Sequence, residues 1–134
     1  MKRYNISGIY IFDKFPDEEE RHPTCIEDCQ EETRLNWLNS LDAEALKRTF
    51  AIIIEAIKRI NDIAFEGIEG KPDIDTILSD SIKIVASSED TVKLVKAVNL
   101  VCKQLHEITD YLISEDIIKK VEDDEICGDS SDLQ

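Results

Sequence analysis

The sequence predicts an all-α protein, a four-helix bundle-like domain of four to five helices with an extended N-terminal arm or single strand. Long segments repeat apolar residues every three or four positions, which is the period of an α-helix. The chain has only four glycines and three prolines, and most of them fall between these segments. Short connections between amphipathic helices favour antiparallel neighbours, as in helical bundles. A chain of 134 residues is expected to form one such domain.

The first 23 residues are expected to form an extended arm rich in aromatic and acidic residues. An extended chain would place four side chains on one side, those of Tyr4, Ile6, Tyr10 and Phe12. A lone strand leaves backbone donors and acceptors unpaired, so it either pairs with a partner chain or lies across the helices as an irregular arm. Pro16 and His22-Pro23 end the segment.

The helical domain is predicted to span residues 24–122. Thr24 and Glu27 have the spacing of a capping box, which predicts a short helix from Cys25 to Asn39. Trp37 in this helix is either a core anchor or an exposed interface anchor. Asp42 is a suitable N-cap for a long central helix from Ala43 to about Phe65.

Three more helices are predicted beyond Gly67 and Gly70. One begins after Asp73 and ends near Ser87, and the next runs from there to about Ile113. Ser114 is expected to cap a last short helix through Val121, and residues 123–134 are expected to form an acidic mobile tail. The apolar faces of the two long helices are wide for so small a body, which favours a homo-oligomer, most simply a two-fold dimer.

The charge of the chain is strongly negative and unevenly distributed. The formal net charge is −14, which disfavours direct binding to nucleic acid or to an anionic membrane. Residues 13–32 hold nine acidic and two basic residues, and residues 115–134 hold eight acidic and two basic residues. The candidate partner-binding residues in these segments are Asp17, Glu18, Glu19, Glu20, Glu27, Asp28, Glu31, Glu32, Glu122, Asp123, Asp124 and Glu125.

Such acidic segments have two interpretations. They maintain solubility, which is the usual role of charge runs. Alternatively, carboxylates spaced over a rigid body imitate a phosphate backbone and occupy a basic groove on a partner protein, with binding that weakens in salt. The sequence therefore predicts a non-enzymatic acidic protein-interaction module that binds a protein with a basic surface, in its sharpest form an inhibitor that mimics nucleic acid.

The alternative is a small zinc-stabilised helical domain. Cys25 and Cys29 are four residues apart, as are Cys102 and His106, and residues four apart share one face of a helix. Two facing helices would then offer three thiolates and one imidazole to a tetrahedral zinc ion. His22 and Cys127 are substitutes within this idea. The competing interpretation is that the cysteines are ordinary free thiols.

The segment Glu107-Ile-Thr-Asp110 resembles one half of the magnesium site of the all-helical nucleotide pyrophosphatases of the MazG type. The resemblance implies a magnesium-dependent all-α nucleotide hydrolase. It covers a few residues, and the paired-glutamate motif that the family carries one helix earlier is missing here. The sequence also lacks a Walker loop, GxGxxG and HExxH, and no catalytic residue is predicted.

The expected location is the cytoplasm. No run of residues approaches the ~18 consecutive apolar positions of a membrane span. The N-terminus lacks the apolar core and cleavage site of a secretion signal. Four cysteines in 134 residues are too few for a disulfide scaffold, so free thiols in a reducing compartment are expected.

Overall fold

The computed structural model describes residues 2–67 and 69–114, which are mostly helical and include a small two-stranded sheet. The helices and strands follow one another as β1 (Tyr10–Asp13), β2 (His22–Cys25), the 3₁₀ turn η1 (Ile26–Asp28), α1 (Glu31–Leu38), α2 (Ala43–Ala64), α3 (Ile74–Ile77), α4 (Ser79–Ser87) and α5 (Thr91–Ser114). The predominantly helical class was predicted, but the sheet was not.

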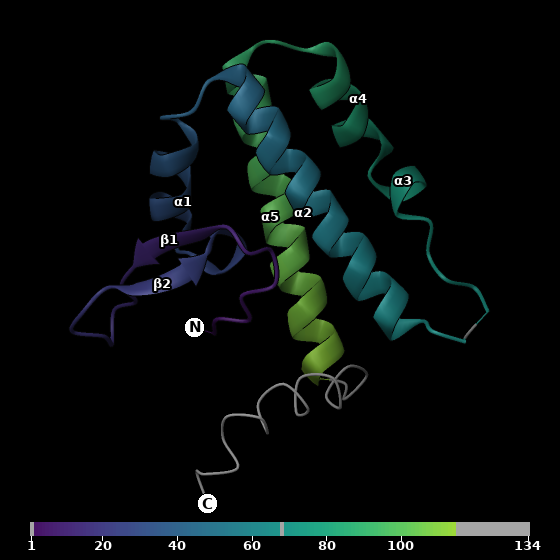
Figure 1. Cartoon of the computed structure of the whole chain (residues 1–134), viewed down its shortest axis with the longest axis horizontal. Helices are drawn as coiled ribbons and strands as arrows, with labels where there is room; N and C mark the ends of the chain where they lie inside the picture. The colour runs from purple at the N-terminus through teal and green to yellow at the C-terminus, as the bar shows by residue number, and fades with distance from the viewer. Residues whose placement is uncertain (1, 68, 115–134) are drawn as a thin grey trace, which may run out of the picture.

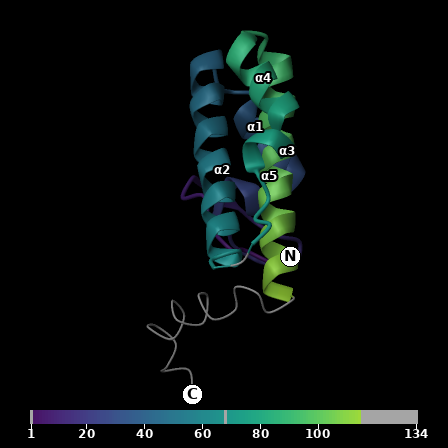
Figure 2. The ribbon, with the colours of Figure 1, turned by 90° about the vertical axis from the view of Figure 1, so that its right-hand side faces the viewer.

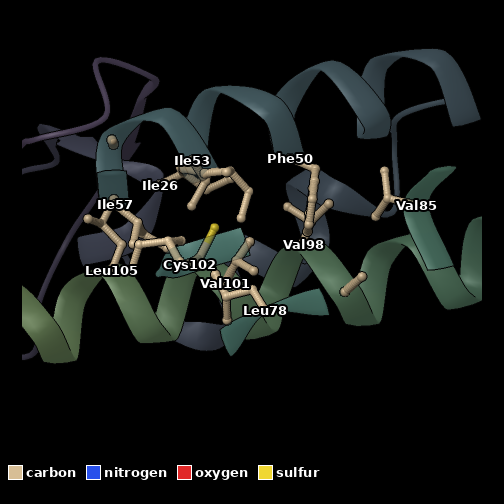
Figure 3. Packing of buried hydrophobic residues seen from close by; sticks show 14 of the residues in the cluster. Ile26, Phe50, Ile53, Ile57, Leu78, Val85, Val98, Val101, Cys102 and Leu105 are labelled. Atoms are coloured by element: carbon tan, nitrogen blue, oxygen red, sulfur yellow. The ribbon is translucent and has the colours of Figure 1, made fainter. Parts of the chain in front are cut away.

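Helices α2 and α5 lie side by side at the centre of the molecule (Figure 1). The side chain of Asp42 accepts a hydrogen bond of 2.9 Å from the backbone N–H of Ala45, so the predicted N-cap of α2 is confirmed. The apolar stripes of the two helices face each other and are buried. Figure 3 shows Phe50, Ile53 and Ile57 of α2 directed at Val98, Val101, Cys102 and Leu105 of α5.

The two central helices run in the same direction, which differs from the predicted antiparallel order. Lys47 near the start of α2 pairs with Glu89, just before the start of α5. The chain returns between them through α3 and α4, which lie on one side of the α2–α5 pair, while α1 and the sheet lie on the other (Figures 1 and 2). Ile74, Leu78 and Val85 anchor this return segment in the core.

The N-terminal segment is not a lone arm or strand, so this prediction was wrong. Strand β1 pairs antiparallel with β2 of the same chain, with Tyr10 opposite Cys25 and Asp13 opposite His22. Pro23 lies in β2 opposite Phe12, although its sequence context indicates only a break in the chain. A proline is tolerated in the short edge strand of a two-stranded sheet because one side of that strand needs no ladder hydrogen bond.

The first helix begins at Glu31 rather than at Cys25, and it ends at Leu38. Cys25 is the last residue of β2, and the predicted capping box of Thr24 and Glu27 does not form because the Glu27 carboxylate binds the backbone of residues 6 and 7 instead. Trp37 packs against the core and is partly buried.

The predicted third helix is divided at Leu78 into α3 and α4, and the fourth begins at Thr91. The predicted helix from Ser114 to Val121 and the acidic tail 123–134 lie outside the described residues. Within the described part of the chain, no helix combines the length and the apolar character needed to cross a membrane.

Candidate functional site

Two acidic residues of η1 are buried and hold the N-terminal segment. Glu27 and Asp28 are 3% and 1% exposed. Asp28 Oδ2 accepts hydrogen bonds of 2.7 Å from the backbone N–H groups of both Tyr4 and Asn5. Glu27 Oε2 accepts from the next two N–H groups, those of Ile6 at 2.9 Å and Ser7 at 3.0 Å. The two carboxylates, named here the buried acidic cluster, therefore bind four consecutive backbone amides.

The backbone of this segment is bent to present those amides. Asn5 has a φ of 53°, in the left-handed region that asparagine tolerates better than most residues, and its Oδ1 accepts a hydrogen bond of 2.9 Å from the Cys25 N–H. Gly8 follows with a φ of 83°, a conformation that glycine adopts without steric cost. The residue types at both positions therefore match the conformation that the cluster needs.

The buried acidic cluster is joined to α5 through His106. Its Nδ1 lies 2.7 Å from Asp28 Oδ1. This hydrogen bond raises the pKa of His106 above its ordinary value, against the opposing effect of burial, so the charged imidazole is favoured. The ring of Tyr4 lies 5.3 Å from that of His106, and the Tyr4 hydroxyl donates to Asp110. These contacts fasten the N-terminal segment to α5.

Glu27 and Asp28 are consequently not available to a partner protein, so this part of the predicted binding surface was wrong. Their burial had a signal in the sequence. Cys25, Ile26 and Cys29 flank them on both sides with apolar or weakly polar side chains, whereas Asp17–Glu20 is a continuous acidic run followed by Arg21. Asp28 takes part in three hydrogen bonds and Glu27 accepts two, and such bonds are the condition under which a carboxylate is tolerated in a protein interior.

A cavity of about 210 Å³ lies beside His106 and includes both members of the cluster in its walls. Glu27 Oε1 is buried there and has no hydrogen-bond partner among the described residues. Cys29 also lines the cavity, but burial raises the pKa of its thiol to about 12, so the thiol is protonated at neutral pH and a poor nucleophile. A carboxylate–imidazole pair can transfer a proton, and among the described residues that line this cavity no thiol with a lowered pKa accompanies the pair.

Arg34 of α1 is a buried residue that the sequence did not single out. Its Nε donates a hydrogen bond of 2.6 Å to Asn99 of α5, and its Nη1 donates to the carbonyl oxygens of Cys29 at 3.2 Å and Ile26 at 3.4 Å. The guanidinium therefore links α1, η1 and α5. Its position between Thr33 and Leu35 in a short polar helix gave no local signal of burial.

Asp13 at the end of β1 is a second structural carboxylate. It accepts hydrogen bonds of 2.9 Å from the Gln30 N–H and 2.8 Å from the Thr33 hydroxyl. Burial acts to raise the pKa of Asp13, but these hydrogen bonds outweigh it and leave the pKa below its ordinary value. The start of α1 is thereby fixed against the end of β1.

The four predicted zinc ligands, Cys25, Cys29, Cys102 and His106, do not form a metal site. Among the described residues, no three His, Cys, Asp or Glu side chains are placed to hold a metal ion. The prediction required Cys25 and Cys29 on one helix, but Cys25 ends a strand and Cys29 follows a 3₁₀ turn. His106 is engaged by Asp28, and Cys102 is fully buried in the core.

The two substitute ligands do not restore this site. His22 lies in β2 with its Nε2 3.8 Å from Glu18, and Cys127 is outside the described residues. The three described cysteines are free thiols, and burial raises the pKa of each. Each of these three cysteines therefore packs as a small buried apolar residue would.

The remaining acidic candidates differ in their surroundings. Glu18 binds Arg3, with 2.6 Å between Oε2 and Nη1, and this contact lowers the pKa of Glu18 to about 2. Glu31 pairs with Lys103 at 2.7 Å. Four carboxylates are exposed and form no ion pair with any residue that the structure describes. They are Asp17, Glu19, Glu20 and Glu32, named here the acidic surface. The candidates Glu122, Asp123, Asp124 and Glu125 lie outside the described residues.

The residues that resemble a magnesium site lie on α5. Glu107 is exposed, and Asp110 accepts the hydrogen bond from the Tyr4 hydroxyl. They belong to no group of described side chains placed to hold a metal ion. Among the described residues, the spacing of these two carboxylates is the one feature shared with that magnesium site.

Comparisons with known proteins identify no relative. No protein-family model matches the chain, and neither the curated proteins nor the solved structures contain a significant match.

Proposed function

We propose that this chain is a non-enzymatic acidic module that binds a partner protein through a basic surface on that partner. The observation that carries the proposal is the acidic surface of Asp17, Glu19, Glu20 and Glu32, whose carboxylates are exposed and uncompensated by any described residue. Complementary charge accelerates encounter with a basic protein and selects against acidic ones.

The acidic surface is supported by a fixed framework. The loop between β1 and β2 is held by hydrogen bonds within itself. Glu18 Oε1 accepts a hydrogen bond of 2.9 Å from the Phe15 N–H, and the backbone carbonyl of Glu18 accepts one of 2.9 Å from Lys14 Nζ. Arg3 holds the same Glu18 carboxylate and lies 4.1 Å from the centre of the Phe15 ring. The carboxylates on either side of Glu18 are thus presented by an ordered loop, which reduces the entropy lost on binding.

The first turn of α1 belongs to the same region of the molecule. Gln30 and Thr33 bind Asp13, and Gln30 Nε2 also donates a hydrogen bond of 2.6 Å to the carbonyl of Lys14. The helix turn that carries Glu32 is therefore fixed against the end of β1, where the loop to β2 begins. In the sharper form of the proposal, these carboxylates take the place of phosphates in a nucleic-acid-binding groove and inhibit the partner.

The helices serve in this proposal as a bundle-like scaffold. A homodimer, as the sequence predicts, would double the acidic surface and strengthen binding to a repetitive basic partner. Light scattering of the purified chain tests this part. A monomer at micromolar concentration would remove the dimer without affecting the acidic surface.

The test of the proposed function is capture of the partner at two salt concentrations. The chain is immobilised and exposed to cell extract at about 50 mM and about 500 mM NaCl, and bound proteins are identified. We expect a basic protein that is retained at low salt and lost at high salt. A variant that neutralises the acidic surface should retain much less of it, the substitutions being Asp17→Asn, Glu19→Gln, Glu20→Gln and Glu32→Gln.

A matched control removes the same charge from other exposed positions, through Glu44→Gln, Glu55→Gln, Glu69→Gln and Asp80→Asn. This control should bind almost as well as the wild type if the location of the carboxylates matters. Equal loss in both variants would mean that only net charge is involved. A partner held equally at both salt concentrations would contradict an electrostatic interaction.

A further inference from the structure

An open apolar groove lies on the opposite side of the central helices from the sheet. It has a volume of about 410 Å³ and is lined by residues from the C-terminal halves of α2 and α5 and from α3 with its flanking residues. Figure 1 shows α3 on the side of the central helices away from the sheet. Its floor is formed by the buried side chains of Ile57, Ile74, Leu78 and Leu112. A volume of this size accepts two or three apolar side chains of an incoming segment.

Two large apolar side chains line this groove and remain open to solvent. Ile77 at the end of α3 is 61% exposed, and Tyr111 of α5 is 60% exposed. Isolated exposed apolar residues are common, but a pair that lines an apolar groove provides contact area on both sides of a bound segment. Tyrosine is enriched among the residues that dominate binding energy at protein interfaces.

The groove also contains an unsatisfied acceptor. Gln104 of α5 contributes to its lining, and the Oε1 atom of this residue is buried without a hydrogen-bond partner among the described residues. A buried carbonyl oxygen without a donor costs free energy, and an N–H donor of a bound segment would recover it if the Gln104 side chain turned this oxygen into the groove.

The charges around the groove favour a basic occupant. Glu107 lines the groove, is exposed and forms no ion pair with a described residue. The two lysines at the neighbouring hollow are already compensated, since Lys58 lies 3.0 Å from Asp75 and Lys71 lies 2.7 Å from Asp62. Among the described residues that line the groove and this hollow, Glu107 is therefore a carboxylate without an ion-pair partner, whereas both lysines have one.

We propose that this groove docks a basic amphipathic helix of the partner protein, with its apolar face against the groove floor and a lysine or arginine at Glu107. This inference rests on the proposed function and gives the partner a second, apolar point of contact. Helices that place apolar residues three and four positions apart commonly bind such grooves. The groove supplies affinity through apolar burial, while the acidic surface supplies electrostatic attraction.

The test uses the full chain and a synthetic helical peptide of about 18 residues, built of leucine and lysine with leucine on one face. Binding is measured by fluorescence anisotropy at about 150 mM salt. The substitution Ile77→Asn should weaken binding by about tenfold or more, since an exposed isoleucine that becomes buried contributes strongly to affinity. Val92→Asn is the matched control, because Val92 is also 61% exposed but lies at the other end of α5, and it should change affinity by less than about twofold.

Charge at the groove is tested by Glu107→Gln, which should weaken binding by about threefold. The control is Glu44→Gln, which changes an exposed glutamate in the first turn of α2, away from the groove, and should have no effect. A scrambled peptide of the same composition should bind at least about tenfold more weakly. Equal binding of the scrambled peptide, or of a leucine–glutamate helix, would overturn the proposal, as would full affinity in the Ile77→Asn variant.

Two other occupants of the groove would also overturn it. If Ile117→Asn with Ile118→Asn in the full chain strengthens peptide binding, the chain's own C-terminal segment competes for the groove. If Ile77→Asn abolishes self-association in light scattering, a second copy occupies it.

The captured partner separates this inference from the proposed function. A salt-sensitive partner that is lost with the acidic-surface variant but retained by Ile77→Asn contradicts the groove and leaves the function standing. A helix bound at the groove, with no salt-sensitive partner captured, supports the groove and contradicts the function.

Discussion

Asp28→Asn is expected to destabilise the fold by about 2–3 kcal/mol at pH 6. Asp28 uses one oxygen for the Tyr4 and Asn5 N–H groups and the other for His106, all at 2.7 Å. Asparagine has the same shape but only one acceptor oxygen, so it cannot serve the backbone amides and a protonated His106 at once. The loss is one hydrogen bond between charged groups, which contributes about 1.5–3 kcal/mol.

The penalty should depend on pH in a defined direction. The pKa of His106 is raised in the folded chain by the hydrogen bond to Asp28, with Asp110 and Glu27 contributing further negative charge. The resulting stabilisation is fully present below the unfolded pKa of about 6.5 and is lost as pH rises through the higher folded value. The difference between wild type and Asp28→Asn should therefore be larger at pH 6 than at pH 9.

The assay is equilibrium unfolding in urea, followed by far-ultraviolet circular dichroism at both pH values. Asp17→Asn is the control, because Asp17 is exposed and unpaired among the described residues, and its effect should stay within about 0.5 kcal/mol. If Asp28→Asn is as stable as the wild type at pH 6, or its penalty is the same at pH 9, the structural role assigned to the buried acidic cluster is refuted.

Two further predictions concern the interior. Ile57→Ala should lower the free energy of unfolding by about 2–5 kcal/mol, because Ile57 of α2 is fully buried against α5. Ile52→Ala on the same helix, where Ile52 is 45% exposed, should lower it much less in the same urea titration. Similar losses of stability in the two variants would mean that Ile57 is not in the core. In a Cys127→Ser background at pH 8, a thiol-specific colour reagent should leave Cys29 and Cys102 unmodified until denaturant is added, since burial raises the pKa of both thiols. Rapid reaction in the native protein would contradict their burial.

The long helices were predictable because their signals are local. The stripe from Leu46 to Ala64 lies within α2, and the cap at Asp42 directly precedes it. The predicted boundaries differ from the observed Ala43–Ala64 by one residue. Apolar spacing likewise located most of α5, although its start lies at Thr91. In both helices the buried face follows the period of the sequence.

The hairpin and the buried carboxylates could not be predicted in the same way, because their stability comes from contacts between distant residues. Strand β2 contains His22-Pro23, which locally indicates a break, and it is a strand only because β1 pairs with it. Asp28 is 24 residues from Tyr4 and 78 from His106. Reading a run of charges as solvent-exposed is correct for Asp17, Glu19 and Glu20. The same reading fails for Glu27 and Asp28, because the sequence does not show that they bind backbone amides.

The parallel order of α2 and α5 was also beyond local patterns. Short connections favour antiparallel neighbours, but the segment between these helices includes α3 and α4 and is long enough to return along the molecule. The apolar groove is a consequence, since α3 has one turn and covers only part of the C-terminal halves of the long helices.

The most direct test of the proposed function is the salt dependence of partner affinity. The protein captured at low salt is titrated against the chain by calorimetry at about 50, 150 and 500 mM NaCl, with the wild type and the acidic-surface variant. A dissociation constant that rises steeply with salt for the wild type, and much less for the variant, is the predicted result. A constant that is unchanged across the three concentrations would contradict recognition through Asp17, Glu19, Glu20 and Glu32.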